Sequence, residues 1–433
     1  MTATCDNATP SSTSPRAGTR LWVPVSLAMF VAAWGGNEFT PLLVMYRQDG
    51  GLSPIAVDGL LFTYVLGIVP ALLLGGPLSD RFGRRPLMLP APILAGLGSL
   101  LLALGPHSVG LLSVGRVLSG VALGLSMAVG GSWIAELTVR DGQPAAVGAR
   151  RAAMSLTAGF GIGAGLAAVL AQWGPWPTVL PYAVNITLAV GALAWLTTTP
   201  ETRSRKADQP RKRLVNDLKI PGVAHRRFLF VVIPLAPWVF GACATAYAII
   251  PALMSARTSG APIAFAGLCC VLGLAAGFGI QSVGRRIDDP NSIRAVATAL
   301  IILAIGMGLA VASAMMLTIW MSLVAAAVLG CGYGMAMISG LLEVQRMAGP
   351  DNLAGLTAVF YGVTYLGFAM PMLLAWISEQ FTAVTYPMMF GFGVVAALIC
   401  LLVVVVAHRY DRAASADATS NSTTLTDTTP AIR

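Results

Sequence analysis

Long apolar runs alternate with short polar segments along almost the whole chain. Each run has about 20 residues or more, the length at which an α-helix crosses a hydrocarbon layer of about 30 Å. The pattern predicts an all-α membrane protein with twelve transmembrane helices. The predicted spans are residues 21–46, 54–78, 87–106, 109–136, 151–173, 177–199, 228–254, 263–283, 295–314, 317–343, 355–378 and 385–407.

The polar segments divide these spans into two groups of six. Residues 1–20 and 408–433 are rich in Ser, Thr and other small residues, and they predict disordered cytoplasmic tails. Residues 200–227 form the only long polar segment between spans and are strongly basic, which predicts a cytoplasmic linker. We therefore expect one six-helix bundle over residues 21–199 and a second over residues 228–407.

Three features of the first half recur in order in the second half, which indicates two pseudo-symmetric bundles. They are a Pro-to-Arg segment that ends a span, a Glu near the inner end of a span, and an Arg-Arg hairpin. Repeated bundles with a binding site between them are typical of secondary transporters. The matching positions are Pro41 to Arg47 with Pro251 to Arg257, Glu136 with Glu343, and Arg84-Arg85 with Arg285-Arg286.

Composition places the chain in a membrane. It is 56% hydrophobic and 10% charged, whereas soluble domains carry about 25% charged residues. The net charge of +9 does not indicate nucleic-acid binding, because of where the charges lie. With the N-terminus inside, only Arg47 and Arg257 fall on outer segments and Arg116 lies within a span. The positive-inside rule predicts a multi-pass cell-membrane protein with both termini cytoplasmic.

Cofactor and catalytic patterns are missing. Five of the six Cys lie inside apolar runs, the three His fall in loops or tails, and no Walker sequence is present. We expect no metal and no other cofactor. A membrane enzyme should carry clustered catalytic polar groups and a sensor should carry a folded cytoplasmic domain, so both classes are disfavoured.

Two ionisable residues lie deep in predicted spans, where a charge is costly. Glu38 is eight residues from the outer end of the first span, roughly 12 Å deep, and Arg116 is about 10 Å deep in the fourth. Their matching depth predicts that they pair. One interpretation is a fixed ion pair that fastens two helices. The other, which we favour, is a carboxylate that gains and loses a proton during transport.

Residues 75–86 form a charged hairpin between two spans. Its Gly76, Asp80, Arg81, Gly83, Arg84 and Arg85 match G-x-x-x-D-R-x-G-R-R, and the hairpin resembles the loop between helices 2 and 3 of the major facilitator superfamily. The resemblance implies two six-helix bundles that work by alternating access, with this loop as a cytoplasmic latch. It also implies that Asp80 faces the N-terminus of span 11; the alternative is a turn cap.

Other motifs refine this resemblance. Arg116, Gly120 and Gly124 are similar to a span 4 motif associated with proton coupling, and an acid in span 1 resembles drug/proton antiporters. However, span 5 lacks the proline of the antiporter motif. Pro200-Glu201-Thr202-Arg203 resembles a sugar-porter element, although the Gln-rich span 7 motif of that family is absent.

The family arrangement puts the site between spans 1, 4, 7 and 10. Glu136 and Glu343 are candidates for an inner gate that pairs with the Arg hairpins, or they are solvated carboxylates. The candidate proton-coupling and substrate residues are Asn37, Glu38, Arg116, Trp133, Trp238 and Tyr247.

We expect proton-coupled export of a small, partly apolar compound. The alternative is proton-coupled uptake of a small nutrient such as a sugar or an organic acid. The expected partners are a small-molecule substrate, protons and the lipid bilayer, with no nucleic acid, and we expect a monomer.

Overall fold

The computed structural model describes residues 20–48, 51–203, 221–258, 260–290, 292–348 and 353–426. Over these residues the chain is helical and contains no strand. Eleven helical segments are long and apolar enough to cross a membrane, and the shorter helix Leu180–Leu196 occupies the remaining predicted span. The all-α prediction is confirmed. The first predicted tail and most of the predicted linker lie outside the described residues.

The first half of the chain forms one bundle. Its helices are α1 (Val23–Asn37), α2 (Phe39–Gln48), α3 (Pro54–Phe82), α4 (Arg84–Met88), α5 (Pro90–Leu104), α6 (Val109–Leu125), the π-turn η1 (Ser126–Gly130), α7 (Gly131–Arg140), α8 (Ala145–Trp173) and α9 (Leu180–Leu196).

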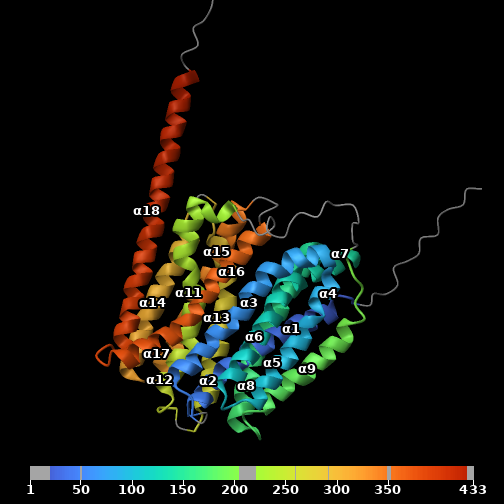
Figure 1. Cartoon of the computed structure of the whole chain (residues 1–433). Helices are drawn as coiled ribbons and strands as arrows, with labels where there is room; N and C mark the ends of the chain where they lie inside the picture. Colours follow the sequence, from blue (N-terminus) through green and yellow to red (C-terminus); the bar gives the residue numbers. More distant parts are fainter. Residues whose placement is uncertain are drawn as a thin grey trace, which may run out of the picture.

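The second half forms the other bundle, and the two lie side by side (Figure 1). Its elements are η2 (Pro221–Ala224), η3 (Phe228–Val232), α11 (Ile233–Ala244), η4 (Thr245–Ile249), α12 (Ile250–Met254), α13 (Pro262–Ile287), α14 (Arg294–Met316), α15 (Ile319–Met347), α16 (Leu353–Tyr365), η5 (Leu366–Ala369), α17 (Met370–Gln380) and α18 (Tyr386–Thr426).

The last helix differs from the expectation. The sequence predicts that the final span ends at residue 407 and that a disordered tail follows, whereas α18 continues to Thr426. The residues after Tyr410 include several Ala, which has the highest helix propensity. This composition favours continuation of the helix beyond the apolar run.

Proline interrupts the first span of each bundle. Pro41 has no N–H to donate to the carbonyl of Asn37, so α1 ends at Asn37 and α2 begins at Phe39. Pro251 likewise has no N–H to donate to the carbonyl of Tyr247, and Tyr247 lies within the π-turn η4. The repeat seen in the sequence therefore has a structural counterpart, and it leaves Glu38 at a break between two helices.

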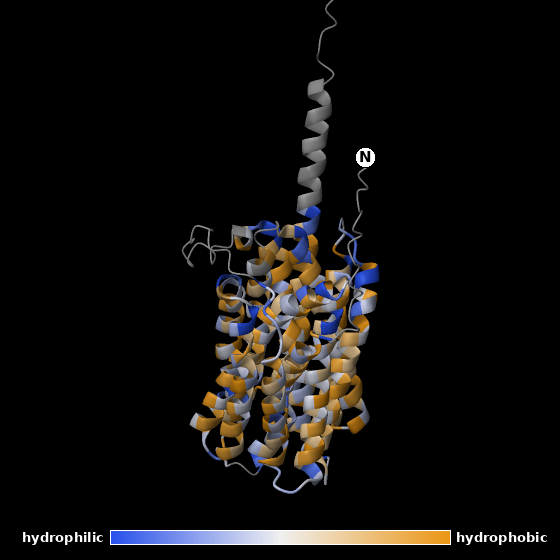
Figure 2. Ribbon diagram, turned by 90° about the vertical axis from the view of Figure 1, so that its right-hand side faces the viewer, coloured by the Kyte–Doolittle hydropathy of each residue, from blue (hydrophilic) through white to orange (hydrophobic). Residues whose placement is uncertain are grey.

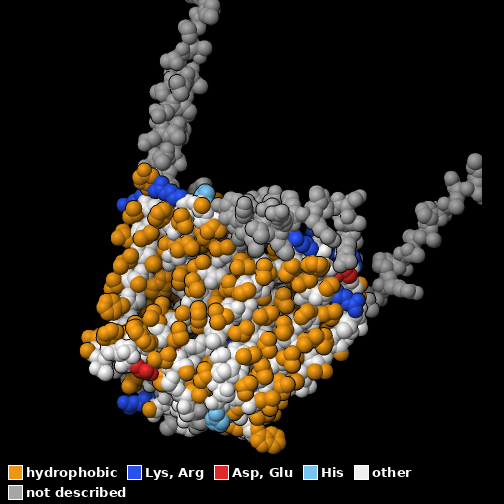
Figure 3. All heavy atoms as spheres, in the orientation of Figure 1, with side chains coloured by type: hydrophobic (Ala, Val, Ile, Leu, Met, Phe, Trp, Pro, Cys, Tyr) orange, Lys and Arg blue, Asp and Glu red, His pale blue; other side chains and the backbone are white. Residues whose placement is uncertain are grey.

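The surface fits a bilayer. Apolar residues cover the flanks, while hydrophilic residues collect at the two ends (Figures 2 and 3). We call the end that carries α4 and the end of α7 the basic face, and the end that carries Gly260 the opposite face.

Among the described residues, the buried apolar clusters join the two bundles in one half of the molecule only. In the half near the opposite face, Phe39, Leu61 and Ala164 belong to the same buried cluster as Tyr247 and Phe368. We call this cluster the shared core. Near the basic face, the buried clusters around Trp133 and around Phe360 each stay within one bundle. The opposite face is thus closed, and the basic face is where the bundles are less joined.

Candidate functional site

Glu38 is enclosed inside the N-terminal bundle, with an exposed fraction of 0%. The hydroxyl of Ser99 on α5 donates to its Oε1 at 2.7 Å. The amide Nδ2 of Asn185 on α9 donates to the Ser99 oxygen at 2.8 Å and lies 3.5 Å from the same Glu38 oxygen. Among the described residues, Glu38 Oε2 has no hydrogen-bond partner. The carboxyl group is therefore held by uncharged groups on one oxygen only.

Arg116 lies next to the same helix break but binds other groups. Its guanidinium donates to the carbonyls of Gly36, at 3.0 Å, and Leu60, at 3.3 Å. It also lies over the rings of Phe39 and Tyr64, 4.8 and 4.4 Å from their centroids. Carbonyl dipoles and ring faces thus stabilise this buried cation.

The predicted ion pair between Glu38 and Arg116 is wrong for this structure. No salt bridge joins them, although both residues are described. The reason is that depth alone does not set direction: Glu38 faces α5 and α9, while two carbonyls and two rings surround the guanidinium. The positive charge of Arg116 still lies close to Glu38, because the guanidinium contacts Gly36 and Phe39, on either side of Glu38 in the chain.

Asn37 faces the other bundle. Its Nδ2 donates to the carbonyl of Phe160, at 3.1 Å, and to Sγ of Cys270 on α13, at 3.4 Å. Its Oδ1 accepts from Thr40 at 2.8 Å. Tyr247 is buried in the shared core that includes Cys270. Asn37 and Tyr247 therefore lie at the bundle interface, as the family arrangement implies for the site.

The two tryptophans lie elsewhere. Trp133 is fully buried in a core of the N-terminal bundle near the basic face, and its Nε1 donates to the carbonyl of Pro200 at 3.3 Å. Trp238 is half-buried and packs against the core of the C-terminal bundle. The expectation that Trp133 lines a central cavity is corrected: its indole fills a core instead.

Aromatic rings that the sequence did not single out meet at the interface. Phe240 stacks against both Tyr365 and Phe368, with centroid distances of 4.4 and 4.8 Å. Tyr64 of the N-terminal bundle meets Tyr365 and Phe368 edge-on. Ser99 and Asn185 were also missed, because sequence reasoning searched for charges. Asn185 was the available signal, because an Asn within an apolar span is costly to bury without a hydrogen-bond partner.

The basic-face hairpin is built around Gly83. Its φ of +104° favours glycine, and a Cβ there would lie 2.6 Å from Glu201 Oε2. The backbone N–H groups of Arg84 and Arg85 donate to the two carboxylate oxygens of Glu201 at 3.0 and 2.9 Å. Burial would raise the pKa of Glu201, but these and further backbone donors hold it below its ordinary value.

The acids of this hairpin pair within their own bundle. Asp80 forms ion pairs with Arg84, at 2.9 Å, and Arg203, at 2.8 Å. Glu136 pairs with Arg84 at 3.0 Å, one of the partners expected for it. Asp80 and Glu136 therefore pair within the N-terminal bundle and with the segment after α9, and residues 349–352, which precede α16, lie outside the described residues.

Glu343 has different partners from those expected. Its carboxylate pairs with Arg227 at 2.6 Å and Arg346 at 2.8 Å, and Arg346 also pairs with Asp288. The predicted pairing with Arg285 and Arg286 is wrong in this structure. The reason is that Arg227, which precedes η3, and Arg346, one helical turn along α15, bring their guanidinium groups within ion-pair distance.

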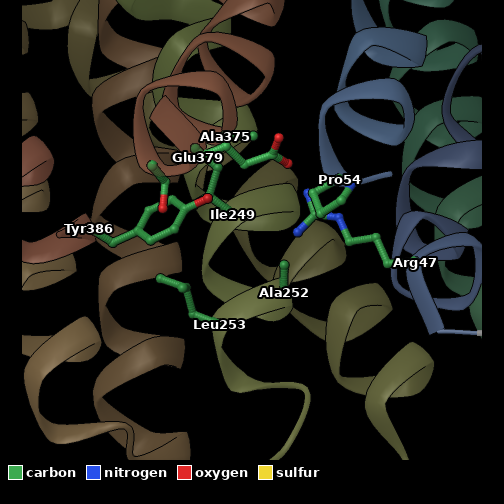
Figure 4. A pocket seen from close by; sticks show the side chains of 9 residues that line it. Arg47, Pro54, Ile249, Ala252, Leu253, Ala375, Glu379 and Tyr386 are labelled. Carbon is green, nitrogen blue, oxygen red and sulfur yellow. The ribbon is translucent and has the colours of Figure 1, made fainter. Parts of the chain in front are cut away.

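A cavity of about 280 Å³ lies between the bundles at the opposite face. Arg47 reaches it from the N-terminal bundle, while Glu379 and Tyr386 reach it from the C-terminal bundle (Figure 4). Arg47 also forms an ion pair with the buried Asp58. The opposite face thus retains a small cavity that is lined by a few polar and several apolar side chains.

Curated relatives include transporters with different named substrates. A chloramphenicol resistance protein of Pseudomonas aeruginosa is 26% identical over 356 residues, 76% of this chain and 77% of that protein. A 3-(3-hydroxy-phenyl)propionate transporter of Escherichia coli K12 is 30% identical over 178 residues, 40% of this chain and 41% of that one. The second match therefore covers less than half of either protein.

Solved structures share the fold at low sequence identity. The nucleoside transporter NupG superimposes with a TM-score of 0.65 at 12% identity, covering 88% of this chain and 98% of that one. A D-xylose-proton symporter gives 0.64 at 17% identity, with 88% and 96% coverage. The family profile described as Major Facilitator Superfamily matches residues 25–370. This chain belongs to the major facilitator superfamily of transporters.

Proposed function

We propose that this transporter exchanges protons for a small, partly apolar compound and exports that compound by alternating access. It acts as a monomer in the cell membrane, with the basic face and both termini on the cytoplasmic side. The placement of Lys and Arg supports this orientation, since only Arg47 and Arg257 lie on segments at the opposite face.

The enclosed carboxyl group of Glu38 carries the proposal. Ionising it in place is costly, because one oxygen has no donor and no cation lies within ion-pair distance among the described residues. A proton can be bound there at little cost and released when the surroundings rearrange. Such a group links its charge to the conformation of the bundle.

The packing between bundles supports alternating access. The shared core closes the opposite face, while the buried clusters near the basic face are separate. Export would require the shared core to part while the basic face closes. In that step the hairpin at Gly76 to Arg85 and the carboxylates of Glu136 and Glu343 would exchange partners across the bundles, as a latch and an inner gate.

The direction and the substrate rest on chemistry and on relatives. The bundle interface presents aromatic rings, and the C-terminal bundle has no charged residue in the middle of its spans. Such a surface suits an uncharged, partly apolar compound. The relatives named for chloramphenicol resistance and as a bacillibactin exporter favour export. The relative named as a transporter of 3-(3-hydroxy-phenyl)propionate favours the second candidate, proton-coupled uptake of an organic acid.

The test uses purified protein in proteoliposomes with an imposed pH gradient and labelled chloramphenicol or an aromatic acid as probe. Glu38→Gln removes the ionisable group and keeps the side-chain size, so we expect no proton-driven transport. Asp141→Asn, at an exposed acid that follows α7 at the basic face, is the matched control and should transport normally. If Glu38→Gln still moves protons with substrate at the wild-type ratio, the proposal fails.

A further inference from the structure

Asn37 and Glu38 are consecutive residues whose side chains reach different parts of the molecule. Glu38 points into the N-terminal bundle, toward Ser99 and Asn185. Asn37 reaches Cys270 of the C-terminal bundle. Glu38 directly follows Asn37 and is the single turn residue between α1 and α2, so the two side chains share one short backbone segment.

The Asn37–Cys270 contact is part of the closure of the opposite face. Cys270 is fully buried in the shared core. A second polar link between the bundles lies nearer the surface. There Gln172 of α8 accepts from the backbone N–H groups of Ile263 and Ala264, at 2.9 and 3.1 Å, at the start of α13. Of these two links, only that of Asn37 adjoins a titratable group.

Few ionisable groups face Glu38, so its own charge dominates the site. Arg116 faces it from α6, Tyr46 from α2 and Tyr182 from α9, and the two tyrosine hydroxyls hydrogen-bond each other at 2.8 Å. Neither α5 nor residues 152–173 of α8 contain an ionisable residue. An ionised Glu38 would therefore be stabilised by moving toward Arg116 or by drawing in water, and either change would alter the contacts at the helix break.

We propose that Asn37 is a coupling residue that transmits the protonation state of Glu38 to the closure of the opposite face. Ser99 and Asn185 act as positioning residues that hold the neutral carboxyl group when that face is closed. This proposal rests on the proposed role of Glu38 as the proton site. Ionisation of Glu38 shifts the break, withdraws Asn37 from Cys270 and favours opening of the shared core.

Cys270 offers a direct readout of this opening. The full-length chain, with its other five cysteines replaced by Ala, is placed in proteoliposomes and alkylated with N-ethylmaleimide at acidic, neutral and alkaline pH. Because thiol reactivity itself rises with pH, each rate is divided by that of the matching Glu38→Gln variant. We expect this ratio to rise with pH, by about tenfold for a typical coupling free energy.

Asn37→Ala should break the coupling. In this variant Cys270 should be alkylated fast at every pH. The ratio of its alkylation rate to that of the Asn37→Ala/Glu38→Gln double variant should not change with pH. Gln172→Ala is the matched control: it weakens closure at a distance from Glu38, so labelling should accelerate while the pH dependence remains. If Asn37→Ala does not fold, Asn37→Ser, whose hydroxyl is too short to reach Cys270, replaces it.

The outcomes separate this inference from the proposed function. Retention of the parent pH dependence in Asn37→Ala would overturn the role of Asn37. A parent ratio that does not change with pH would also overturn it, even where Glu38→Gln abolishes proton-driven transport and so leaves the proposed function intact. Normal proton-driven transport by Glu38→Gln would instead reject the proton site on which both depend.

Discussion

At the residue scale, the buried polar groups of the N-terminal bundle are stabilised mainly by neutral partners. Arg116 binds two backbone carbonyls and lies over two aromatic rings. Glu38 accepts a hydrogen bond from the hydroxyl of Ser99, which in turn accepts one from the amide of Asn185. A directly paired Arg and Glu would fasten the helices in one arrangement. Neutral partners leave the carboxyl group free to change charge without an ion pair to break.

The geometry around Arg116 requires a guanidinium. Lys keeps the charge, but one ammonium group cannot reach both carbonyls and also lie flat over two rings. We expect Arg116→Lys to destabilise the protein by roughly 1–3 kcal/mol, measured as a lower melting temperature in detergent. Arg140→Lys, whose parent residue makes two carbonyl contacts at the exposed basic face, is the control and should change little. Equal losses in both variants would contradict this account of the site.

At the scale of elements, the basic-face hairpin works as a capped turn. The first two N–H groups of the short helix α4 would lack partners within the helix, and the Glu201 carboxylate binds both. Glu201 belongs to the Pro200-Glu201-Thr202-Arg203 segment, which follows α9. The segment that resembled a sugar-porter element therefore holds the hairpin in shape.

Two glycines of the hairpin motif should respond differently to alanine. Gly83→Ala places a side chain at positive φ and against Glu201, so we expect a loss of roughly 1–3 kcal/mol. Gly76→Ala lies inside α3 with nothing within 4 Å of the new Cβ, so it should be neutral or stabilising. Melting temperatures of the two variants measure the contrast. A similar loss in both would show that the turn geometry is not what requires Gly83.

At the scale of the whole molecule, the buried apolar clusters are shared between the bundles near one face and separate near the other. Under the proposed alternating access, this arrangement would let the bundles rock. The bundles are joined by apolar packing near the opposite face and by few contacts of this kind near the basic face. Close packing of this kind has discrete arrangements rather than a continuous range. Parting the shared core is therefore the step that should limit opening of the opposite face.

Orientation in the membrane can be tested with exposed positions at either end. Trp176→Cys lies at the opposite face and Asp141→Cys follows α7 at the basic face. In intact cells an impermeant thiol reagent should label the first and not the second, because the basic residues gather on the cytoplasmic side. Labelling of Asp141→Cys alone would reverse the proposed orientation. Membrane permeabilisation, which should expose both positions, controls for reactivity.

The fold class, the succession of membrane spans and the family could all be predicted from the sequence alone. These follow from hydrophobic length, from glycine and charge spacing, and from the cost of charge in hydrocarbon, all of which are local properties of the chain. The sequence also indicated the repeat, through the matching Pro-to-Arg segments at 41–47 and 251–257, the Glu136 and Glu343 pair, and the two Arg-Arg hairpins.

The direction in which each buried side chain points depends on the tertiary structure. Glu38 contacts Ser99 and Asn185 instead of pairing with Arg116. Glu343 pairs with Arg227 instead of Arg285. The indole of Trp133 packs in a core. Helix rotation and the close packing of several helices set these contacts. A residue's depth can be counted along the chain, but its direction depends on neighbours that are distant in sequence.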